Sequence, residues 1–213
     1  MSNPSSDWTE VSLDTIATFI SGYSYKGKEL TSSDVAMATI KNFNRTGGFK
    51  LDGYKEIIPS NKLKATQHAN QFDLLVAHTD LTQNAEVIGN AEMVMSTSGY
   101  SDIVFSMDLV KVLPKEGISK FLLAALLQDK HFKAHCLGYV NGTTVLHLSR
   151  KALPEYSLLL PSSSVLHELD KTITPMYLAI ANNIKENTEL TNLRDSLLPK
   201  LMSGEIDVSN VDL

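Results

Sequence analysis

The chain has 213 residues, of which 43% are hydrophobic, and a net charge of −5 at pH 7. This composition is typical of a globular protein with a core of its own, and its acidic balance excludes a strongly basic nucleic-acid-binding protein. No apolar run is long enough to span a membrane, the N-terminus lacks the pattern of a signal peptide, and the single cysteine, Cys136, excludes an internal disulfide, so we expect a cytoplasmic protein.

The first sixty residues predict one short helix followed by strands and loops. The helix is indicated by apolar residues at helical spacing after the possible cap Ser12, namely Leu13, Ile16, Ala17 and Ile20. The stretch 21–62 is rich in small and polar residues, which favours short strands and loops. The pairs Gly47-Gly48 and Asp52-Gly53 are turn signals within it.

Three apolar stretches then predict the strands of a sheet. Residues 72–78 read as a buried strand. Residues 85–95 are apolar and β-branched around Gly89-Asn90, which favours two strands joined by a turn. Residues 102–113 predict one further strand that ends at Pro114.

The next segment predicts a helix and two more strands. Residues 118–133 carry apolar positions at helical spacing. Asn141-Gly142 is a tight-turn signal, and residues 143–148 read as the strand after it. A final strand over 156–160 ends at Pro161.

The C-terminal part predicts a long helix that meets another helix. With Leu166 at position a of a heptad, eight of the eleven a and d positions up to Leu201 are apolar. A continuous helix over 164–201 would be about 57 Å long. We expect its dimer interface to consist of Leu166, Leu169, Ile173, Met176, Ile180, Asn183, Asn187, Leu190, Leu197 and Leu201. Pro175 should kink or break this helix.

The same apolar stripe is also compatible with a helix that packs on its own globular part. Against that alternative stand the length of the helix and a second apolar strip at Tyr177, Ile184 and Leu198, which lets the helix serve two neighbours at once. The elements together predict a mixed α/β (α+β) fold. We expect a globular domain over 1–161, a helix over 162–204 that pairs antiparallel as a coiled coil, and a tail over 205–213.

Signals for catalysis are weak. The sequence carries no phosphate-binding loop, nucleophile elbow, zinc-protease motif or methyltransferase motif, so we expect no catalytic residue and no cofactor. His131, His135 and Cys136 lie close in sequence, but no acidic or further cysteine ligand accompanies them. Packing roles are therefore favoured over a metal site.

Four segments resemble one known family. The sequence LTNLRDSLLPKLMSGEI at 190–206 resembles the conserved-region helix that closes the specificity subunits of type I restriction-modification enzymes. WTEVSLDTI at 8–16 looks like the opening of a target recognition domain, and FDLLVA at 72–77 looks like a strand of that domain, with Phe72 where the family usually has glycine. The run from Gly142 to Pro161 looks like the family's passage into the helix.

The resemblance implies a DNA-reading subunit without chemistry of its own, which holds methyltransferase (modification) subunits and through them the restriction subunit. Such subunits usually carry two recognition domains and two helices, whereas this chain has one of each. Two copies could pair their helices and present two identical recognition domains to an inverted repeat with a gap. The expected partners are therefore double-stranded DNA, a second copy and the modification subunits, with no membrane.

For DNA contact we expect loop residues that can donate hydrogen bonds to phosphates or bases. They are Tyr23, Ser24, Tyr25, Lys26, Arg45, Lys50, Lys55, His78, Thr79, Asn141, Thr143 and Thr144. Because phosphate neutralisation supplies most of the non-specific affinity for DNA, an acidic recognition subunit should bind DNA weakly by itself. Binding should tighten when the modification subunits also hold the duplex.

Two alternatives remain beside this hypothesis. A truncated specificity subunit could act as an interaction or regulatory protein without a DNA target of its own. An enzyme with an unrecognised site is the other, and activity on DNA without any partner would reveal it.

Overall fold

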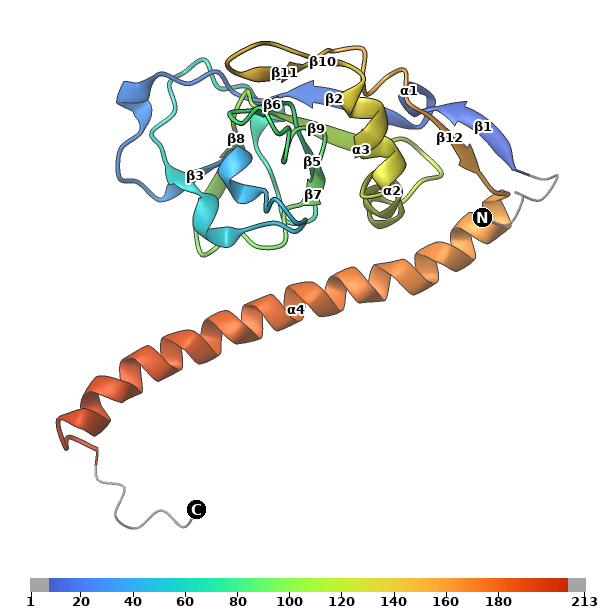
Figure 1. Ribbon diagram of the computed structural model, residues 1–213. Helices are drawn as coiled ribbons and strands as arrows, with labels where there is room; N and C mark the ends of the chain where they lie inside the picture. Colours follow the sequence, from blue (N-terminus) through green and yellow to red (C-terminus); the bar gives the residue numbers. More distant parts are fainter. Residues whose placement is uncertain (1–7, 207–213) are drawn as a thin grey trace.

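The computed structural model describes residues 8–206, which form a mixed α/β body and one long helix (Figure 1). The strands are β1 (Thr9–Ser12), β2 (Ala17–Ser21), β3 (Val35–Ala38), β4 (Lys55–Glu56), β5 (Leu74–Ala77), β6 (Thr79–Asp80), β7 (Ala91–Met93), β8 (Asp102–Phe105), β9 (Leu109–Pro114), β10 (Val140–Asn141), β11 (Leu146–Leu148) and β12 (Ser157–Leu160). The helices are α1 (Leu13–Ile16), α2 (Lys120–Leu127), α3 (Lys130–Leu137) and α4 (Ser163–Met202). Short 3-10 turns cover Gly27–Glu29, Ile40–Asn42, Leu51–Gly53 and Ala65–Gln67. The predicted α+β class with a long C-terminal helix is confirmed.

The strands form four small sheets. The largest has the order β2-β9-β5-β7 and is antiparallel throughout. A second has the order β4-β3-β8, in which β3 and β8 run parallel. The hairpin β10-β11 adds β6 to make a third sheet, and β1 pairs with β12 in the fourth. The first strand of the body thus lies beside the strand that leads into α4.

Strand β5 is buried on both faces, which explains its uninterrupted apolar sequence. Leu74 and Val76 belong to the core cluster that α2 and α3 cover. Leu75 and Ala77 point to the opposite side, into the cluster shared with β3 and β8. Since successive side chains of a strand alternate between faces, four consecutive apolar residues can fill two cores at once.

Helix α4, hereafter the arm, packs on the body only over its first half. Leu166 and Ala181 are buried, and Ile173, Tyr177 and Ile184 pack against the same core cluster. These residues recur at helical spacing, so they form one face of the arm. Beyond residue 184 every described residue of the helix is exposed. The arm therefore has a root seated on the body and a free end, which Figure 1 shows extending past it.

Pro175 neither breaks nor ends the arm, so of the two effects expected of it, a kink or a break, the break is wrong. One helix runs from Ser163 to Met202 with Pro175 and Pro199 inside it. Ile173 and Tyr177, on either side of Pro175, both pack on the body. Their packing offsets the hydrogen bond that the proline removes.

Two other predicted helices differ from the structure. The segment after Ser12 makes a single turn, α1, and continues as β2, which pairs along its whole length with β9. The predicted helix over 118–133 is two helices. Ser119 caps α2 by accepting from the Leu122 N–H, and Asp129 starts α3 by accepting from the His131 N–H.

Two strand predictions also need correction. Residues 102–113 form two strands in different sheets, separated by the turn Ser106-Met107-Asp108. Of the segment 85–95, only β7 is a strand. The part before it is held in a loop by side chains, as described below. Among residues 8–206 no helix, the arm included, combines the length and apolar content that a membrane span requires.

Candidate nucleic-acid interface

The predicted DNA-contact residues fall into three groups on the body. The first group gathers around the turn Ser106-Met107-Asp108. The Met107 N–H donates to the Tyr23 carbonyl at 2.9 Å, and the His78 N–H donates to the Asp108 carbonyl at 2.7 Å. These bonds bring the segment 23–26 and residues 78–79 to one place, although more than fifty residues separate them in sequence.

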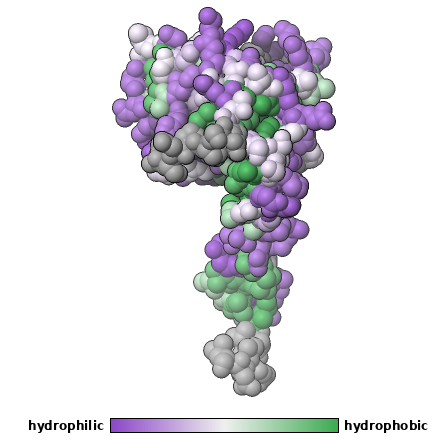
Figure 2. All heavy atoms as spheres, turned by 90° about the vertical axis from the view of Figure 1, so that its right-hand side faces the viewer, coloured by the Kyte–Doolittle hydropathy of each residue, from purple (hydrophilic) through white to green (hydrophobic). Residues whose placement is uncertain are grey.

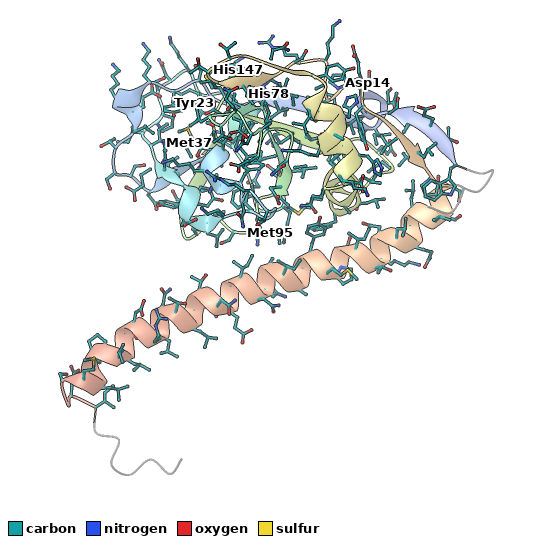
Figure 3. All side chains as sticks on the ribbon, in the orientation of Figure 1. Asp14, Tyr23, Met37, His78, Met95 and His147 are labelled. Carbon is teal, nitrogen blue, oxygen red and sulfur yellow. The ribbon has the colours of Figure 1, made fainter. Side chains whose placement is uncertain are left out.

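Electrostatics in the first group centre on Asp108. Burial and the nearby Asp108 carboxylate raise the pKa of Tyr25. Burial, with His147 and Arg150 close by, lowers the pKa of His78 and outweighs the opposite effect of Asp108. His78 is therefore held neutral more strongly than a free imidazole, which suits it to hydrogen bonding rather than to charge pairing with a phosphate. In Figure 3, His78 and His147 lie on the side of the body away from the arm, and Met95 lies on the side facing it.

Two predicted members of the first group are buried. Tyr23 lies in the core, and its hydroxyl group donates to Glu29 Oε2 at 2.7 Å and lies 2.8 Å from Ser60 Oγ. Thr79 is also buried and donates through Oγ1 to Asp108 Oδ1 at 3.1 Å. Both side chains are buried and hydrogen-bonded to other groups of the protein, so neither is available to a ligand at the surface. The prediction that the Tyr23 and Thr79 side chains contact DNA is therefore wrong.

The second group is the loop Arg45–Gly48 with Lys50. Gly47 and Gly48 both have positive φ, which lets the loop turn tightly between Asn44 and Phe49. Arg45 is exposed and its Nε lies 3.1 Å from Glu86 Oε2. Lys50 is exposed as well, with Nζ 3.7 Å from Asp52. A cleft of about 380 Å³ separates this loop from residues 80–87.

The third group is the tip of the β10-β11 hairpin. Asn141, Thr143 and Thr144 are exposed there, and Gly142 has a φ of 116°. The Gln83 Nε2 donates to the carbonyls of Thr143 and Thr144, at 2.8 and 3.3 Å. Lys55 belongs to none of the three groups. It is half-buried on β4, opposite Met37 of β3.

The segment 79–86 touches all three groups, and sequence reasoning missed it. Thr79 bonds to Asp108 in the first group, Glu86 pairs with Arg45 in the second, and Gln83 holds the hairpin tip of the third. The available signal was Asp80 followed two residues later by Thr82. This is the pattern of an aspartate that bonds to its own backbone in a turn.

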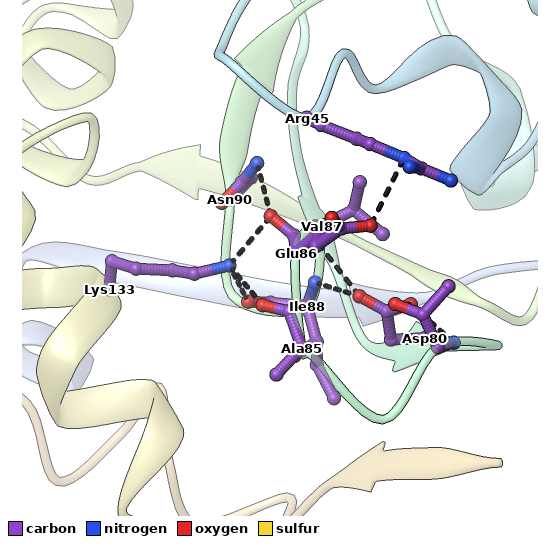
Figure 4. Close-up of polar contacts among 9 residues, drawn as sticks. Arg45, Asp80, Ala85, Glu86, Val87, Ile88, Asn90 and Lys133 are labelled. Atoms are coloured by element: carbon purple, nitrogen blue, oxygen red, sulfur yellow. Dashed lines mark hydrogen bonds and ion pairs between the residues drawn. The ribbon is translucent and has the colours of Figure 1, made fainter.

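The buried carboxylate of Asp80 and the half-buried ammonium group of Lys133 fix this segment (Figure 4). The Asp80 carboxylate accepts from the N–H groups of Thr82, Val87 and Ile88 at 2.8, 2.7 and 3.2 Å. Lys133 Nζ reaches in from α3 and donates to the carbonyls of Ala85, Glu86 and Ile88. The backbone groups that a strand would use are thus taken by side chains, which is why residues 85–88 form a loop.

The predicted His-Cys cluster is part of the packing of α3. Cys136 is fully buried, and burial raises the pKa of its thiol to about 12. His135 Nε2 lies 2.8 Å from the Ala152 carbonyl, and His131 pairs with Asp129. Within residues 8–206 no group of three or more His, Cys, Asp and Glu side chains is placed to hold a metal ion.

The predicted interface residues divide between the two halves of the arm. Leu166 is buried in the body and Ile173 partly so, because position a of the first heptads faces the body. Tyr177 and Ile184 of the second strip also face the body, so the expectation that this strip speaks against packing on the protein's own globular part is wrong for the first half of the arm. The remaining predicted residues, Leu169, Met176, Ile180, Asn183, Asn187, Leu190, Leu197 and Leu201, are exposed. Figure 2 shows the apolar surface that results near the far end of the arm.

Comparison with known proteins gives one consistent relation. No family model matches the chain. It is 29% identical over 97 residues to the type I restriction enzyme MjaIX specificity subunit of Methanocaldococcus jannaschii, a match that covers 41% of this chain and 22% of that protein. It is 32% identical over 99 residues to the type I restriction enzyme HindI specificity subunit of Haemophilus influenzae, covering 45% of this chain and 21% of that protein.

The fold is similar to that of the type I restriction-modification S subunit from M. genitalium, with a TM-score of 0.64 at 12% identity. That match covers 95% of this chain and 48% of the other, so the chain spans about half the length of the subunit whose fold it shares. The resemblance indicated by the sequence motifs is confirmed: in sequence and in fold, the chain is related to the specificity subunits of type I restriction-modification enzymes.

Proposed function

We propose that this chain is a DNA-sequence recognition subunit of a type I restriction-modification system and performs no chemistry itself. The observation that carries the proposal is the similarity to specificity subunits, which extends over the body and the arm together. In this proposal residues 1–161 form the recognition domain, residues 162–204 form the helix that joins it to a partner, and residues 205–213 form a tail. Residues 1–7 and 207–213 lie outside the described part of the chain.

We propose further that two copies pair antiparallel through their arms. The d positions Leu169, Met176, Leu190 and Leu197 are exposed and recur at multiples of seven residues, which is the spacing of a coiled-coil seam. Leu190 leaves 55% of its surface in water in the single chain. Burying such side chains against a second helix is favourable by about 25 cal/mol for each Å² removed from water.

Asn183 and Asn187 lie at the middle of this stripe and are exposed. Polar residues at seam positions favour one register and one orientation at some cost in stability. A pair related by twofold symmetry would present two identical bodies, so its DNA target would be an inverted repeat with a gap. Methyltransferase subunits would dock on this pair and recruit the restriction subunit.

For base and phosphate contact we propose the exposed and half-buried members of the three groups. They are Ser24, Tyr25, Lys26, Arg45, Lys50, His78, Asn141, Thr143 and Thr144, with Lys55 at the edge of the body. Their donors can reach phosphate oxygens and base edges, and the segment 79–86 holds the three groups, without Lys55, in fixed relation to one another.

Methylation mapping tests this function. The chain is co-expressed with a type I modification subunit, and methylated bases on a plasmid are located. One defined, gapped inverted repeat is expected, with both halves modified. If the two proteins co-purify but no defined site is methylated, the chain is instead an interaction subunit without its own target.

A gel-shift titration tests whether the modification subunit increases the affinity of the chain for DNA. The isolated chain should bind its site weakly because its net charge is −5, and addition of the modification subunit should tighten binding by a hundredfold or so. Equal affinity with and without that subunit contradicts this part of the proposal.

A further inference from the structure

A cleft lies between the Arg45–Gly48 loop and the arm, and its wall contains a buried carboxylate. The cleft has a volume of about 810 Å³ and is lined by Gly48, Glu92, Gln128 and Tyr177 among others. Glu92 belongs to β7 and leaves only 6% of its surface exposed. A buried carboxylate is costly unless hydrogen bonds compensate for the lost water, so its bonds identify its role.

Glu92 is bonded on two sides to groups from distant parts of the chain. Its Oε1 accepts from the Gly48 N–H at 2.7 Å, a short bond to the glycine turn that follows Arg45. Its Oε2 accepts from Gln128 Nε2, just beyond the end of α2, at 3.5 Å, the longest bond of the series. Burial raises the pKa of Glu92 against the opposing effect of these two donors.

Gln128 continues the connection to the arm. Its Oε1 accepts from the Tyr177 hydroxyl at 2.7 Å. Tyr177 is itself seated on the body by its ring, which stacks on Phe121 with centroids 5.6 Å apart. A continuous series of hydrogen bonds therefore runs from the arm through Gln128 and Glu92 to the backbone of Gly48.

We propose that Glu92 is a positioning residue that ties the Arg45–Gly48 loop to the arm, so that the packing of Tyr177 on the body restrains the Gly48 end of the loop. The inference rests on the proposed function, because it takes Arg45 to be a DNA-contact residue. Gly48 has a φ of 99°, and no other acceptor for its N–H occurs among the described hydrogen bonds. Loss of Glu92 as an acceptor leaves that N–H without a protein partner, and the turn is then held only by its own backbone bonds, from the Asn44 N–H to the Gly48 carbonyl at 3.0 Å and from the Gly47 N–H to the Asn44 carbonyl at 3.1 Å.

Hydrogen exchange of the Gly48 amide, measured by NMR on the full chain without DNA, tests the connection. Glu92→Met removes the acceptor and should speed exchange about tenfold, the effect of losing roughly 1.4 kcal/mol of protection. Glu92→Gln keeps an acceptor oxygen and should stay within about threefold of the original rate. Tyr177→Phe, which removes one hydroxyl group at the arm, should also speed exchange at Gly48.

Tyr139→Phe is the matched control, since the Tyr139 hydroxyl bonds to Glu155 at 2.7 Å elsewhere on the surface. Unchanged Gly48 exchange in Tyr177→Phe or in folded Glu92→Met, or an equal effect of Tyr139→Phe, overturns the connection. If Glu92→Met fails to fold, the Tyr177→Phe result decides alone.

A second measurement separates this inference from the proposed function. The target sequence found by methylation mapping is prepared as an unmethylated duplex. In complex with the modification subunit, Glu92→Met should bind this duplex severalfold more weakly than the unsubstituted chain, and Glu92→Gln should bind it with nearly the original affinity. Faster Gly48 exchange with unchanged DNA affinity overturns the positioning role. Failure of the unsubstituted complex to bind any DNA contradicts the proposed function, while the exchange result still decides whether the arm holds the loop.

Discussion

The Tyr177 ring of the arm stacks on the Phe121 ring of α2, with the two planes 29° apart. This contact joins the arm to an aromatic cluster of the body, because Phe121 also packs edge-on against Phe72. Tyr177→Ala should lower the free energy of unfolding by about 1–3 kcal/mol, since it removes a half-buried aromatic ring from this cluster. Chemical denaturation measures the change. Leu178→Ala, at an exposed neighbouring position, serves as the control and should stay within about 0.5 kcal/mol.

The free end of the arm gives a different prediction. Leu190→Asp should weaken self-association at least thirtyfold, which corresponds to about 2 kcal/mol, because it places a charge in the proposed seam. The helix content and unfolding midpoint of the single chain should change little, since Leu190 is exposed in the part of the arm beyond its packing on the body. Sedimentation equilibrium measures the association. Thr191→Asp adds the same charge beside the seam, and an equal effect of that variant would falsify the proposed interface.

Asp80 predicts a dependence of stability on pH. Burial alone would raise the pKa of Asp80, but the N–H groups of Val87 and Thr82, the Thr82 hydroxyl and the Ile88 N–H outweigh it, so the pKa is lowered. A carboxyl with a lowered pKa stabilises the fold above its unfolded value of about 3.9, and this contribution is lost as the pH falls through the lower folded value.

Asp80→Asn should therefore destabilise the protein by about 1–3 kcal/mol at neutral pH, and the difference should shrink below about pH 4. Thermal melts across pH 2–7 measure both. Asp52→Asn removes an exposed carboxylate and should be nearly neutral. A constant difference between Asp80→Asn and the unsubstituted protein at every pH would show that the charge of Asp80 is not what holds the segment.

Gly22 and Gly27 give a matched pair of substitutions. A Cβ at Gly22 would overlap the Ser106 carbonyl, whereas a Cβ at Gly27 meets nothing within 4 Å. Gly22→Ala should destabilise the fold by about 1–3 kcal/mol and move the 23–26 segment away from the Ser106-Met107-Asp108 turn. Gly27→Ala should be neutral. Denaturation and the chemical shift of the Met107 amide report the two effects, and similar results for both variants would contradict the close approach.

The elements with strong sequence patterns were predictable. β5 and β12 follow from short apolar runs bounded by turn signals, and the arm follows from its heptads. The continuity of the arm through Pro175 could not be predicted from the sequence. It depends on contacts of Ile173 and Tyr177 with the body, and these contacts follow from the folded shape of the body. The strand conformation of Ala17–Ser21 was not predictable for a similar reason. Pairing with β9 fixes this segment as a strand, although its apolar residues happen to recur at helical spacing.

The candidate interface was predictable as residue types but not as an arrangement. Exposed loop residues such as Arg45 and Asn141 follow from turn composition. The role of the segment 79–86 depends on side chains from elsewhere, such as Lys133 and Arg45, that bond to its backbone or to Glu86. Tyr23 shows the reverse case. Its polar neighbours suggest a surface loop, yet a bond to Glu29 satisfies its hydroxyl inside the core.

The pairing of β1 with β12 has a consequence for how the chain folds. Thr9 lies opposite Leu160, so β1 stays without its partner strand until the rest of the body has been synthesised. Contacts between such distant residues form late and slowly. Ser163, where the arm begins, follows the end of β12 after Pro161 and Ser162. The arm can therefore take its final direction only when the two ends of the body have met.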